Sequence, residues 1–156
     1  NQSKNSFDGA IPTSNSISAK NLARLGQFFD NANYTDKARQ TVITFLPGII
    51  QSPTRMPALV DAALYVIKKP IQIVVASELG DRSMINVAHN TLLPNRLLLH
   101  ADSGASQAYL GKHLKFIKST KPINGNSTAF VCENFVCQLP ARSPEDLAEQ
   151  LRGLIE

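Results

Sequence analysis

Residues 71–76 read Ile-Gln-Ile-Val-Val-Ala, and this stretch decides the fold. A continuous apolar run of this length, rich in β-branched side chains, is typical of a strand that helices cover on both faces. Pro70 stands immediately before the run, and upstream of it the apolar residues recur with the period of helices. We therefore predict two parts, a helical segment over residues 1–69 and a small α/β unit over residues 70–156.

Three amphipathic helices are predicted before Pro70. Apolar residues recur there at the three- and four-residue spacing that places side chains on one helix face. The connections are short, so consecutive helices are expected to lie side by side and antiparallel. The predicted inward-facing residues are Ile17, Leu22, Leu25 and Phe29 in the first helix, Ala38, Val42, Phe45 and Ile49 in the second, and Met56, Val60, Ala63, Leu64 and Ile67 in the third.

A strand–helix–strand unit is predicted after Pro70. Asp81 is the predicted N-cap of its helix, which Pro94 ends, and residues 96–100 (RLLLH) predict the second strand. The predicted inward-facing residues of this helix are Met84, Ile85, Ala88 and Leu92. Two strands joined through a helix pair in parallel with a right-handed crossover.

The remaining segments complete a mixed fold. Residues 105–113 predict a short helix, residues 114–117 a short extended piece, and Ser143 and Pro144 the start of a last helix. The predicted fold class is therefore α+β or α/β, with helical hairpins followed by a small α/β unit that ends in a β-hairpin and a helix.

Residues 128–140 read Thr-Ala-Phe-Val-Cys-Glu-Asn-Phe-Val-Cys-Gln-Leu-Pro and predict that β-hairpin. A two-residue turn at residues 134–135 places Cys132 opposite Cys137, and so does a four-residue loop over residues 133–136. Opposed residues of antiparallel strands have Cα atoms about 4.5 to 5.5 Å apart, which overlaps the range of a disulfide.

The two cysteines have three possible roles. Because side chains alternate between strand faces, Cys132 and Cys137 are expected to share an apolar face with Phe130 and Leu139, which fits two buried thiols. A cross-strand disulfide is the second possibility in an oxidising compartment, and a metal or redox-active site is the third. The chain's histidines lack the close spacing of a zinc motif, so we predict no metal site and no cofactor.

Composition and charge narrow the expected partners. The formal charge is +4, and its densest part is a run of lysines, Lys112, Lys115, Lys118 and Lys121. A nucleic-acid surface needs more positive charge with interleaved aromatics, so these lysines predict a solvated face and no nucleic-acid partner. No apolar run approaches the ~18 residues of a membrane helix, and no signal-peptide pattern is present, so we predict no membrane partner and a cytoplasmic location. Because the chain begins at Asn1, we expect a piece of a longer protein.

The loop before the first helix has two interpretations. Residues 8–16 (DGAIPTSNS) contain hydroxyl and amide side chains that can cap a helix N-terminus. In the functional interpretation the loop lies at the mouth of a cleft, where Asp8 acts as an acid or base and Asn15 orients a hydroxyl-rich ligand.

Residues 77–81 (SELGD) follow the first strand, where ligands gather in open α/β sheets. The sequence has neither a G-x-G-x-x-G motif nor a P-loop there, and Glu78 and Asp81 would repel a phosphate. We therefore predict no nucleotide site. No Ser-His-Asp set is assembled from the sequence, since none of the serines lies in a G-x-S-x-G elbow.

Four segments resemble, in order, the motifs of one family. They are Asp8-Gly9-Ala10-x-Pro12-x-x-Asn15-Ser16 with Asn21-Leu22 and Arg24-Leu25 (DGAxPSxNS…NLxRL), Met56-Pro57 with Ala62 and Leu64 (MPQML…AL), Leu93-Pro94-Asn95-Arg96 (LPNK/R), and residues 128–140 (TAYVCxNFxCxxP). On these motifs, nearly the whole chain resembles the thioredoxin-domain-containing proteins related to spermatogenesis-associated protein 20.

The resemblance implies a longer parent protein. An N-terminal thioredoxin-like domain and a middle (α/α)6 barrel, like those of N-acylglucosamine 2-epimerases and six-hairpin glycosidases, would be the partners of this chain. Residues 1–69 would be the last helices of that barrel, and a carbohydrate would be its ligand. The family's usual serine is Thr13 here, which keeps the hydroxyl, while Ile11 stands where many relatives have Glu. Asp8 is then the predicted catalytic residue, and Thr13 and Asn15 are the predicted ligand-binding residues.

Three functions follow from these observations. The chain is expected to be the C-terminal portion of a protein with sugar epimerase-, isomerase- or glycosidase-like chemistry, inactive alone because it lacks most of the cleft. The first alternative is a non-catalytic structural or interaction module. The second is a thiol redox partner acting through Cys132 and Cys137.

Overall fold

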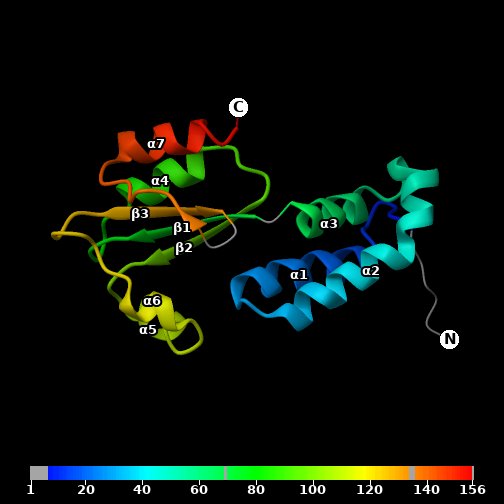
Figure 1. Cartoon of the computed structure of the whole chain (residues 1–156), viewed down its shortest axis with the longest axis horizontal. Coiled ribbons are helices and arrows are strands. Elements are labelled where there is room, and N and C mark those ends of the chain that lie inside the picture. The colour runs from blue at the N-terminus through cyan, green and yellow to red at the C-terminus, as the bar shows by residue number, and fades with distance from the viewer. Residues whose placement is uncertain (1–6, 69, 134–135, 156) are drawn as a thin grey trace. The chain divides into compact units, whose positions relative to one another are not determined.

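The computed structural model describes residues 7–68, 70–133 and 136–155. The chain divides into two compact units, residues 1–69 and residues 70–156, each with its own hydrophobic core (Figure 1). We call them the helical unit and the α/β unit. Helices followed by a mixed α/β unit confirm the predicted fold class.

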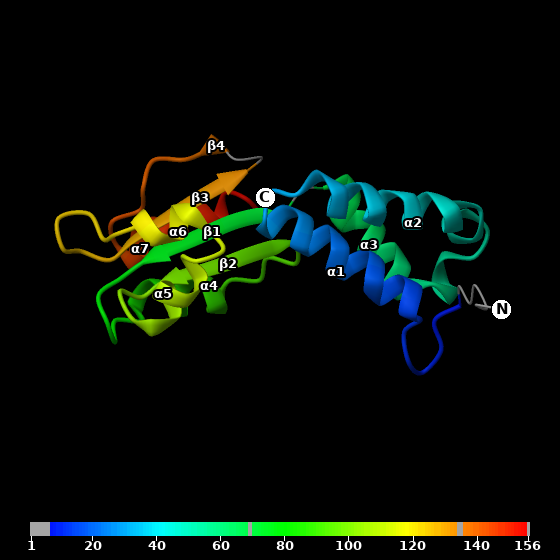
Figure 2. The ribbon, with the colours of Figure 1, turned by 90° about the horizontal axis from the view of Figure 1, so that it is seen from below.

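Three α-helices and one short 3-10 helix form the helical unit. They are α1 (Ser14–Phe28), α2 (Ala32–Gln51), η1 (Pro53–Arg55) and α3 (Pro57–Ile67). Helix α1 packs on both α2 and α3 (Figure 2). The α1–α2 connection is tight, and Gly26 permits it, because a Cβ at this position would lie 2.4 Å from the Thr35 hydroxyl oxygen. Asn31 caps α2 by accepting a hydrogen bond from the Asn33 N–H at 3.0 Å.

Small side chains make up most of the helical unit's core. The buried apolar residues are Ala19, Ala23, Ala38, Val42, Met56, Leu59, Ala62, Ala63 and Tyr65. The predicted inward faces of α1 and α3 are partly wrong, because five of the predicted residues are exposed: Ile17, Leu25, Phe29, Leu64 and Ile67. Each of these helices carries apolar residues on more than one face, so periodicity alone did not identify the face that packs within the unit.

The α/β unit is built on a four-stranded sheet in the order β2-β1-β3-β4. Its elements are β1 (Ile71–Ala76), α4 (Ser83–Asn90), β2 (Arg96–Ala101), α5 (Ala105–Leu110), α6 (Lys115–Ser119), β3 (Thr128–Glu133), β4 (Val136–Cys137) and α7 (Pro144–Arg152). Strands β1 and β2 pair in parallel, as predicted, and β3 is antiparallel to both β1 and β4.

Helices cover both faces of this sheet. Figure 1 shows α4 and α7 on one side and α5 and α6 on the other. On the first side, Ile73 and Val75 of β1 pack in one cluster with α4 and α7 residues such as Met84 and Leu147. On the second side, Leu97 and Leu99 are buried. The covered sheet explains why residues 71–76 are apolar without alternation.

Three local predictions in the α/β unit are wrong. The segment predicted to be extended at residues 114–117 forms helix α6 instead. Arg82 occupies the N-cap position of α4, while the Asp81 carboxylate accepts the Ser83 N–H at 2.9 Å from just outside the helix. Leu92, predicted to face inward, follows the last turn of α4 and is 82% exposed.

The C-terminal hairpin has the predicted register, with Cys132 opposite Cys137 and Glu133 opposite Val136. The predicted turn at residues 134–135 lies outside the described residues. The prediction that Cys137 and Leu139 belong to a buried apolar face is wrong, because Cys137 is exposed and Leu139 is 86% exposed. Strand β4 is the sheet edge and only two residues long, so it brings little side-chain surface into the core.

Candidate functional site

Asp8, the predicted catalytic residue, accepts four hydrogen bonds from the starts of two helices. Its Oδ1 accepts from the Thr13 N–H at 2.8 Å and from the Ser16 hydroxyl at 2.9 Å, both at the start of α1. Its Oδ2 accepts from the Ala58 and Leu59 N–H groups at 2.9 and 3.4 Å, in the first turn of α3. The N-cap of α3 is a methionine, which offers no capping oxygen. Asp8 therefore caps α3 from 50 positions away and ties it to α1.

Thr13 and Asn15, the predicted ligand-binding residues, lie at the start of α1. Thr13 is the N-cap, and its Oγ1 accepts the Ser16 N–H at 3.2 Å and lies 2.7 Å from the Ser16 hydroxyl oxygen. Thr13 is only 8% exposed, whereas Asn15 is half-buried. The structure thus brings Asp8 and Thr13 together in a capping network, and their roles in ligand binding stay predictions.

The electrostatics of Asp8 suit this capping role. Burial raises the pKa of the carboxyl, but the hydrogen bonds from Thr13, Ser16, Ala58 and Leu59 outweigh burial and hold the pKa below its usual value. A carboxylate stabilised in this way is charged at neutral pH and is a weak base. These contacts point to a structural role for Asp8, and none of them points to acid–base catalysis.

The second polar cluster lies at the carboxyl ends of β1 and β2. Ser77 follows β1, and its hydroxyl oxygen lies 2.7 Å from Nε2 of His100 in β2. The chain leaves β1 for α4 on one side of the sheet and leaves β2 for α5 on the other side (Figure 1). Such a divergence is the topological position at which open α/β sheets bind ligands.

Two carboxylates beside this pair hold the neighbouring turns. Asp81 accepts the Ser83 N–H at 2.9 Å and the hydroxyl proton of Ser127. Asp102 accepts the Gly104 N–H at 3.0 Å, in the turn that leads to α5. Both carboxyls have a lowered pKa. Hydrogen bonds, first from Ser127, lower that of Asp81, while at Asp102 burial raises the pKa and hydrogen bonds outweigh it.

The surroundings of His100 disfavour its charged form. Burial is the largest influence and lowers the pKa of its imidazole; Asp102 and Asp81 raise it and Arg82 lowers it, with a net shift below the usual value. Ser77, the hydroxyl partner, is only 1% exposed. A serine nucleophile must reach its substrate, so the pair is better suited to holding the two strand ends together than to acyl transfer.

Sequence reasoning missed this pair because its members are 23 positions apart. The available signal was the presence of polar residues just at the ends of two strands predicted to be parallel, whose carboxyl ends meet at one edge. The prediction of no nucleotide site in residues 77–81 does not concern this pair. The Ser77 hydroxyl contacts His100 and the Glu78 carbonyl, both within the α/β unit.

A pocket of about 460 Å³ lies along α5 and the turn before it. Lys112 and Lys118 line it, together with Ser103 and Gln107. The two polar uncharged side chains are already engaged. The Gln107 amide donates to the carbonyls of Ile117 and residue 120 at 2.7 and 2.8 Å, and the Ser103 hydroxyl donates to a carbonyl at 3.0 Å. Only the two lysines remain to recognise a ligand there, and exposed lysines are the solvated face that the sequence predicts.

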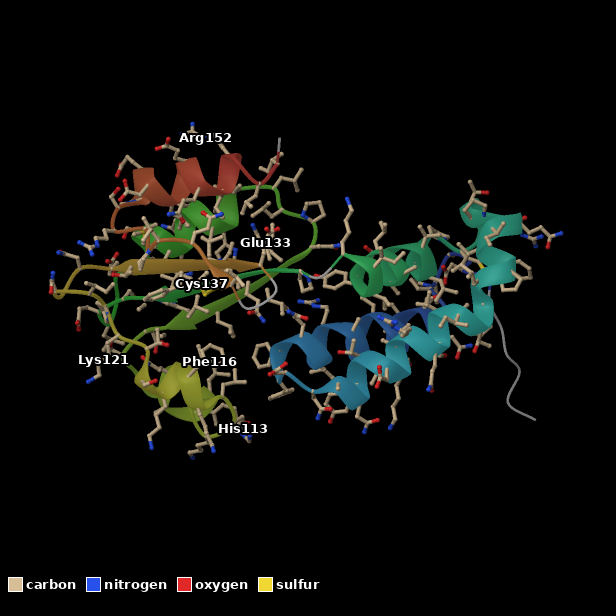
Figure 3. All side chains as sticks on the ribbon, in the orientation of Figure 1. His113, Phe116, Lys121, Glu133, Cys137 and Arg152 are labelled. Carbon is tan, nitrogen blue, oxygen red and sulfur yellow. A yellow bond between two sulfur atoms is a disulfide. The ribbon has the colours of Figure 1, made fainter. Side chains whose placement is uncertain are left out.

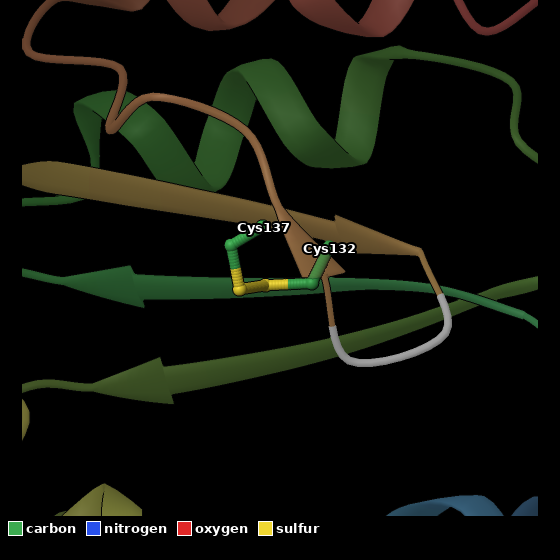
Figure 4. Close-up of a disulfide and its surroundings, with 2 residues drawn as sticks. All are labelled: Cys132 and Cys137. Carbon is green, nitrogen blue, oxygen red and sulfur yellow. A yellow bond between two sulfur atoms is a disulfide. The ribbon is translucent and has the colours of Figure 1, made fainter.

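The two cysteines are joined by a disulfide with an S–S distance of 2.03 Å (Figure 4). Of the three possibilities that the sequence left open, the structure contains the cross-strand bond. Cys132 is 6% exposed and Cys137 is exposed. Within residues 7–68, 70–133 and 136–155, no three His, Cys, Asp or Glu side chains are grouped so that they could hold a metal ion.

The surface of the α/β unit exposes charged side chains as well as single apolar ones such as Leu92 and Leu139. Figure 3 shows Arg152 on the outer side of α7 and His113 beyond α5, away from the sheet. Among the helices that the structure describes, none is both long enough and apolar enough to cross a bilayer.

Comparison with known proteins finds one group of relatives. No family model matches the chain. Human spermatogenesis-associated protein 20 is 31% identical to it over 154 residues, and the mouse and rat proteins of the same name are 28% and 27% identical over 151 residues. These alignments cover 95% of this chain and 19% of each relative, so the chain spans about a fifth of the length of the curated relatives it matches.

The comparisons confirm the relation suggested by the four sequence motifs, while the thioredoxin-like domain and the barrel stay predictions. The chain is homologous to the C-terminal part of spermatogenesis-associated protein 20.

Proposed function

We propose that this chain is a non-catalytic structural part of a longer protein, in which the helical unit completes a helical barrel and the α/β unit follows it. Carbohydrate chemistry of the epimerase, isomerase or glycosidase kind would belong to the rest of that protein, so the chain alone is inactive. The observation that carries the proposal is the apolar surface that the helical unit leaves uncovered.

That surface is clearest on α2. Val42, Phe45 and Ile49 of α2 face the unit's own core, at the i, i+3, i+7 spacing of one face. Ile43 and Ile50 are 58% and 74% exposed and, with Leu46 between them, repeat the same spacing on a second face. A helix that is apolar on two faces is typical of the interior of a larger assembly of helices.

The other two helices show the same feature. Leu64 and Ile67 of α3 are 45% and 74% exposed, and Ile17 and Leu25 of α1 are 44% and 41% exposed. Contiguous apolar surface on a stable monomer is usually small, and larger patches mark interfaces. Helices from the same polypeptide are the occupant we propose, since the relatives are about five times longer than the matched region, which covers 19% of them.

The predicted catalytic loop also supports a structural part. All four hydrogen bonds to Asp8 come from groups at helix starts, and Thr13 is 8% exposed. An acid or base for sugar epimerisation needs access to the substrate and a pKa near the working pH. Asp8 has a lowered pKa, so it meets the second requirement poorly.

The proposal is tested by placing charges on the outer face of α2. The double substitution Ile43→Glu and Ile50→Glu is made both in the 156-residue chain and in a full-length homologue. In the chain alone we expect a change within about 0.5 kcal/mol, as for other exposed sites. In the full-length protein we expect a loss of several kcal/mol, because two charges would be buried without partners. Leu139→Glu, at an exposed site of the α/β unit, is the matched control.

Equal, small effects in both proteins would show that the outer face of α2 stays exposed and would contradict the proposal. The second readout is activity. The isolated chain is assayed against hexoses and N-acylhexosamines for epimerisation and against glycosides for hydrolysis, and turnover by the chain alone would contradict its non-catalytic role.

A further inference from the structure

We propose that Cys132 and Cys137 form a reversible thiol–disulfide site, which dithiols reach in the folded α/β unit and whose reduction frees residues 136–140 from the sheet edge. The substrate class is a dithiol, either a small molecule or a protein with two neighbouring thiols. This site is independent of the proposed barrel interface, because it lies within the α/β unit.

The two sulfurs differ in access. Cys137 is exposed and lies in β4, the outermost strand of the sheet. Cys132 is 6% exposed and lies in β3, one strand further in. Thiol–disulfide exchange depends on which sulfur an attacking thiolate can reach. Attack is therefore expected at Cys137, with Cys132 as the leaving group.

Apart from the disulfide, residues 136–140 are held mainly by hydrogen bonds and strand pairing, with little burial of large apolar side chains. Val136 and Leu139 are 74% and 86% exposed, so they contribute little apolar burial. The segment is held by the antiparallel pairing of Val136 and Cys137 with β3. Two further hydrogen bonds hold it: the Gln138 N–H donates to the Val131 carbonyl at 2.9 Å, and the Gln150 amide donates to the Leu139 carbonyl at 2.9 Å. The disulfide adds a covalent link to this strand pairing and these hydrogen bonds.

The chain is firmly anchored again at Ala141. Its N–H and carbonyl exchange two hydrogen bonds of 2.9 Å with Ala129 of β3, and the residue is 1% exposed. Release after reduction is therefore confined to the residues before Ala141. The core between the sheet and α7 keeps its contacts, since Leu147 and Leu151 are fully buried beyond this anchor.

The exchange proceeds in two balanced steps. A thiolate of the dithiol attacks Sγ of Cys137, which breaks the bond to Cys132 and forms a mixed disulfide, and the Cys132 sulfur takes up a proton. The second thiolate of the dithiol then attacks the first dithiol sulfur, which is bonded to Cys137 in the mixed disulfide. This attack closes the dithiol into a disulfide and releases Cys137, which also takes up a proton. The protein gains two electrons and two protons, and the dithiol becomes a disulfide.

The first experiment measures reduction of the folded chain. The oxidised protein is equilibrated with mixtures of reduced and oxidised dithiothreitol, quenched with acid and alkylated, and the two added masses are counted by mass spectrometry. We expect complete reduction while the far-UV circular dichroism stays native. Reduction that occurs only together with loss of the native signal would overturn the proposal.

The second experiment locates the released segment by amide hydrogen exchange. After reduction, the Gln138 N–H is expected to lose protection by roughly tenfold or more, while the Ala141 N–H changes by less than about twofold. Unchanged protection at Gln138 would show that the disulfide does not hold the segment. Equal loss at Ala141 would show that release spreads through the sheet, and either result overturns the confined release.

Two single variants test the attack site. In Cys132→Ser the remaining thiol is Cys137, and in Cys137→Ser it is Cys132. We expect the exposed Cys137 thiol to react with an aromatic disulfide reagent roughly tenfold faster or more than the buried Cys132 thiol. Equal or reversed rates would overturn attack at Cys137. If a variant does not fold, the reduction and amide exchange experiments on the unmodified chain still test the reversible disulfide and the release of residues 136–140.

Discussion

The helical unit buries mainly alanines and exposes several isoleucines. The α/β unit, in contrast, buries isoleucines, leucines and valines between its sheet and its helices. Both units also expose large apolar side chains, but in different places. In the helical unit most of them lie within helices, at the spacing of a second apolar face. In the α/β unit, residues such as Leu79, Leu92 and Leu139 lie singly in connections, which is normal for a protein surface.

The comparison indicates which unit has a complete core. Burial of large aliphatic side chains stabilises a fold by roughly 1.5 to 3 kcal/mol each, and an alanine contributes far less. The α/β unit encloses Ile73, Val75, Leu147 and Leu151 in one cluster. We therefore expect the α/β unit to be the more stable of the two, because the core of the helical unit consists mostly of small side chains.

Separating the units gives the largest expected effect. Residues 70–156 alone are expected to melt cooperatively and to bind little of a hydrophobic dye. Residues 1–69 alone are expected to melt at a lower temperature and to bind more of the dye, because domains of about 60 residues are marginal even with a good core. Circular dichroism melts and dye fluorescence of the two pieces provide the measurement. A cooperative, dye-free helical piece would break the comparison.

Leu147→Ala is expected to have the next largest effect. Leu147 is fully buried between α7 and the sheet, so the substitution removes buried methyl groups and leaves a cavity. The expected loss is about 2 to 5 kcal/mol of unfolding free energy, measured by urea denaturation. Leu139→Ala, at a site that is 86% exposed, is the matched control and should cost less than about 0.5 kcal/mol. Similar effects at the two sites would contradict the described core.

The parts of this fold that the sequence predicts are those in which the interacting residues lie close together in the sequence. Strand β1 and the pairing of Cys132 with Cys137 were correctly predicted, because both depend on patterns within a few residues. The inner faces of α1 and α3 were not, because two apolar faces give the same periodicity as one broad face. Only packing distinguishes them, and part of that packing is proposed to lie outside this chain.

The same distinction applies to the polar sites. The DGAIPTSNS loop was recognised as either a cap or a cleft, and the hydrogen bonds from Ala58 and Leu59 that favour a cap cross 50 and 51 positions to backbone N–H groups. Backbone donors carry no sequence signal. The pairing of Ser77 with His100 likewise depends on the meeting of two strand ends, which the predicted topology contains but no motif records.

Asp8→Ala tests whether the helical unit depends on the hydrogen bonds by which Asp8 joins the starts of α1 and α3, which we call the Asp8 clamp. The substitution removes the acceptor at the starts of both α1 and α3, so we expect a loss of about 1 to 3 kcal/mol. Urea denaturation of the 156-residue chain, with amide exchange at Leu59 as the local reporter, provides the measurement. Asp36→Ala, at an exposed site of α2, is the matched control. A loss of sugar binding by a full-length homologue with unchanged stability would instead support the cleft interpretation.

Acid sharpens the same test. The pKa of Asp8 is lower in the folded chain than the usual 3.8, so the unfolded chain binds more protons in the window between the two values. The stabilisation by Asp8 is therefore complete above about pH 4 and is lost as the pH falls through the folded value. Asp8→Ala is expected to reduce the acid sensitivity of exchange at Leu59, and an unchanged pH profile would contradict the clamp.

His100→Gln is expected to have the smallest effect on stability. It tests the pH dependence of the α/β unit as Asp8→Ala tests that of the helical unit. Its pKa is lowered from 6.5 in the folded chain, mainly by burial, so below about pH 6.5 the unfolded chain takes up a proton that the folded chain resists. The stabilisation is complete above that pH and is lost as the pH falls toward the folded pKa. His100→Gln keeps a polar group opposite Ser77 but cannot titrate, so it should flatten the pH dependence of amide exchange at Val75 and Val131 as the pH falls below about 6.5. His89→Gln, at an exposed site of α4, is the matched control. The pKa of His100 itself is measured by NMR titration. A pKa at or above the usual value would show that burial is not the largest influence on His100. It would also show that water reaches the carboxyl ends of β1 and β2 more freely than the buried strands indicate.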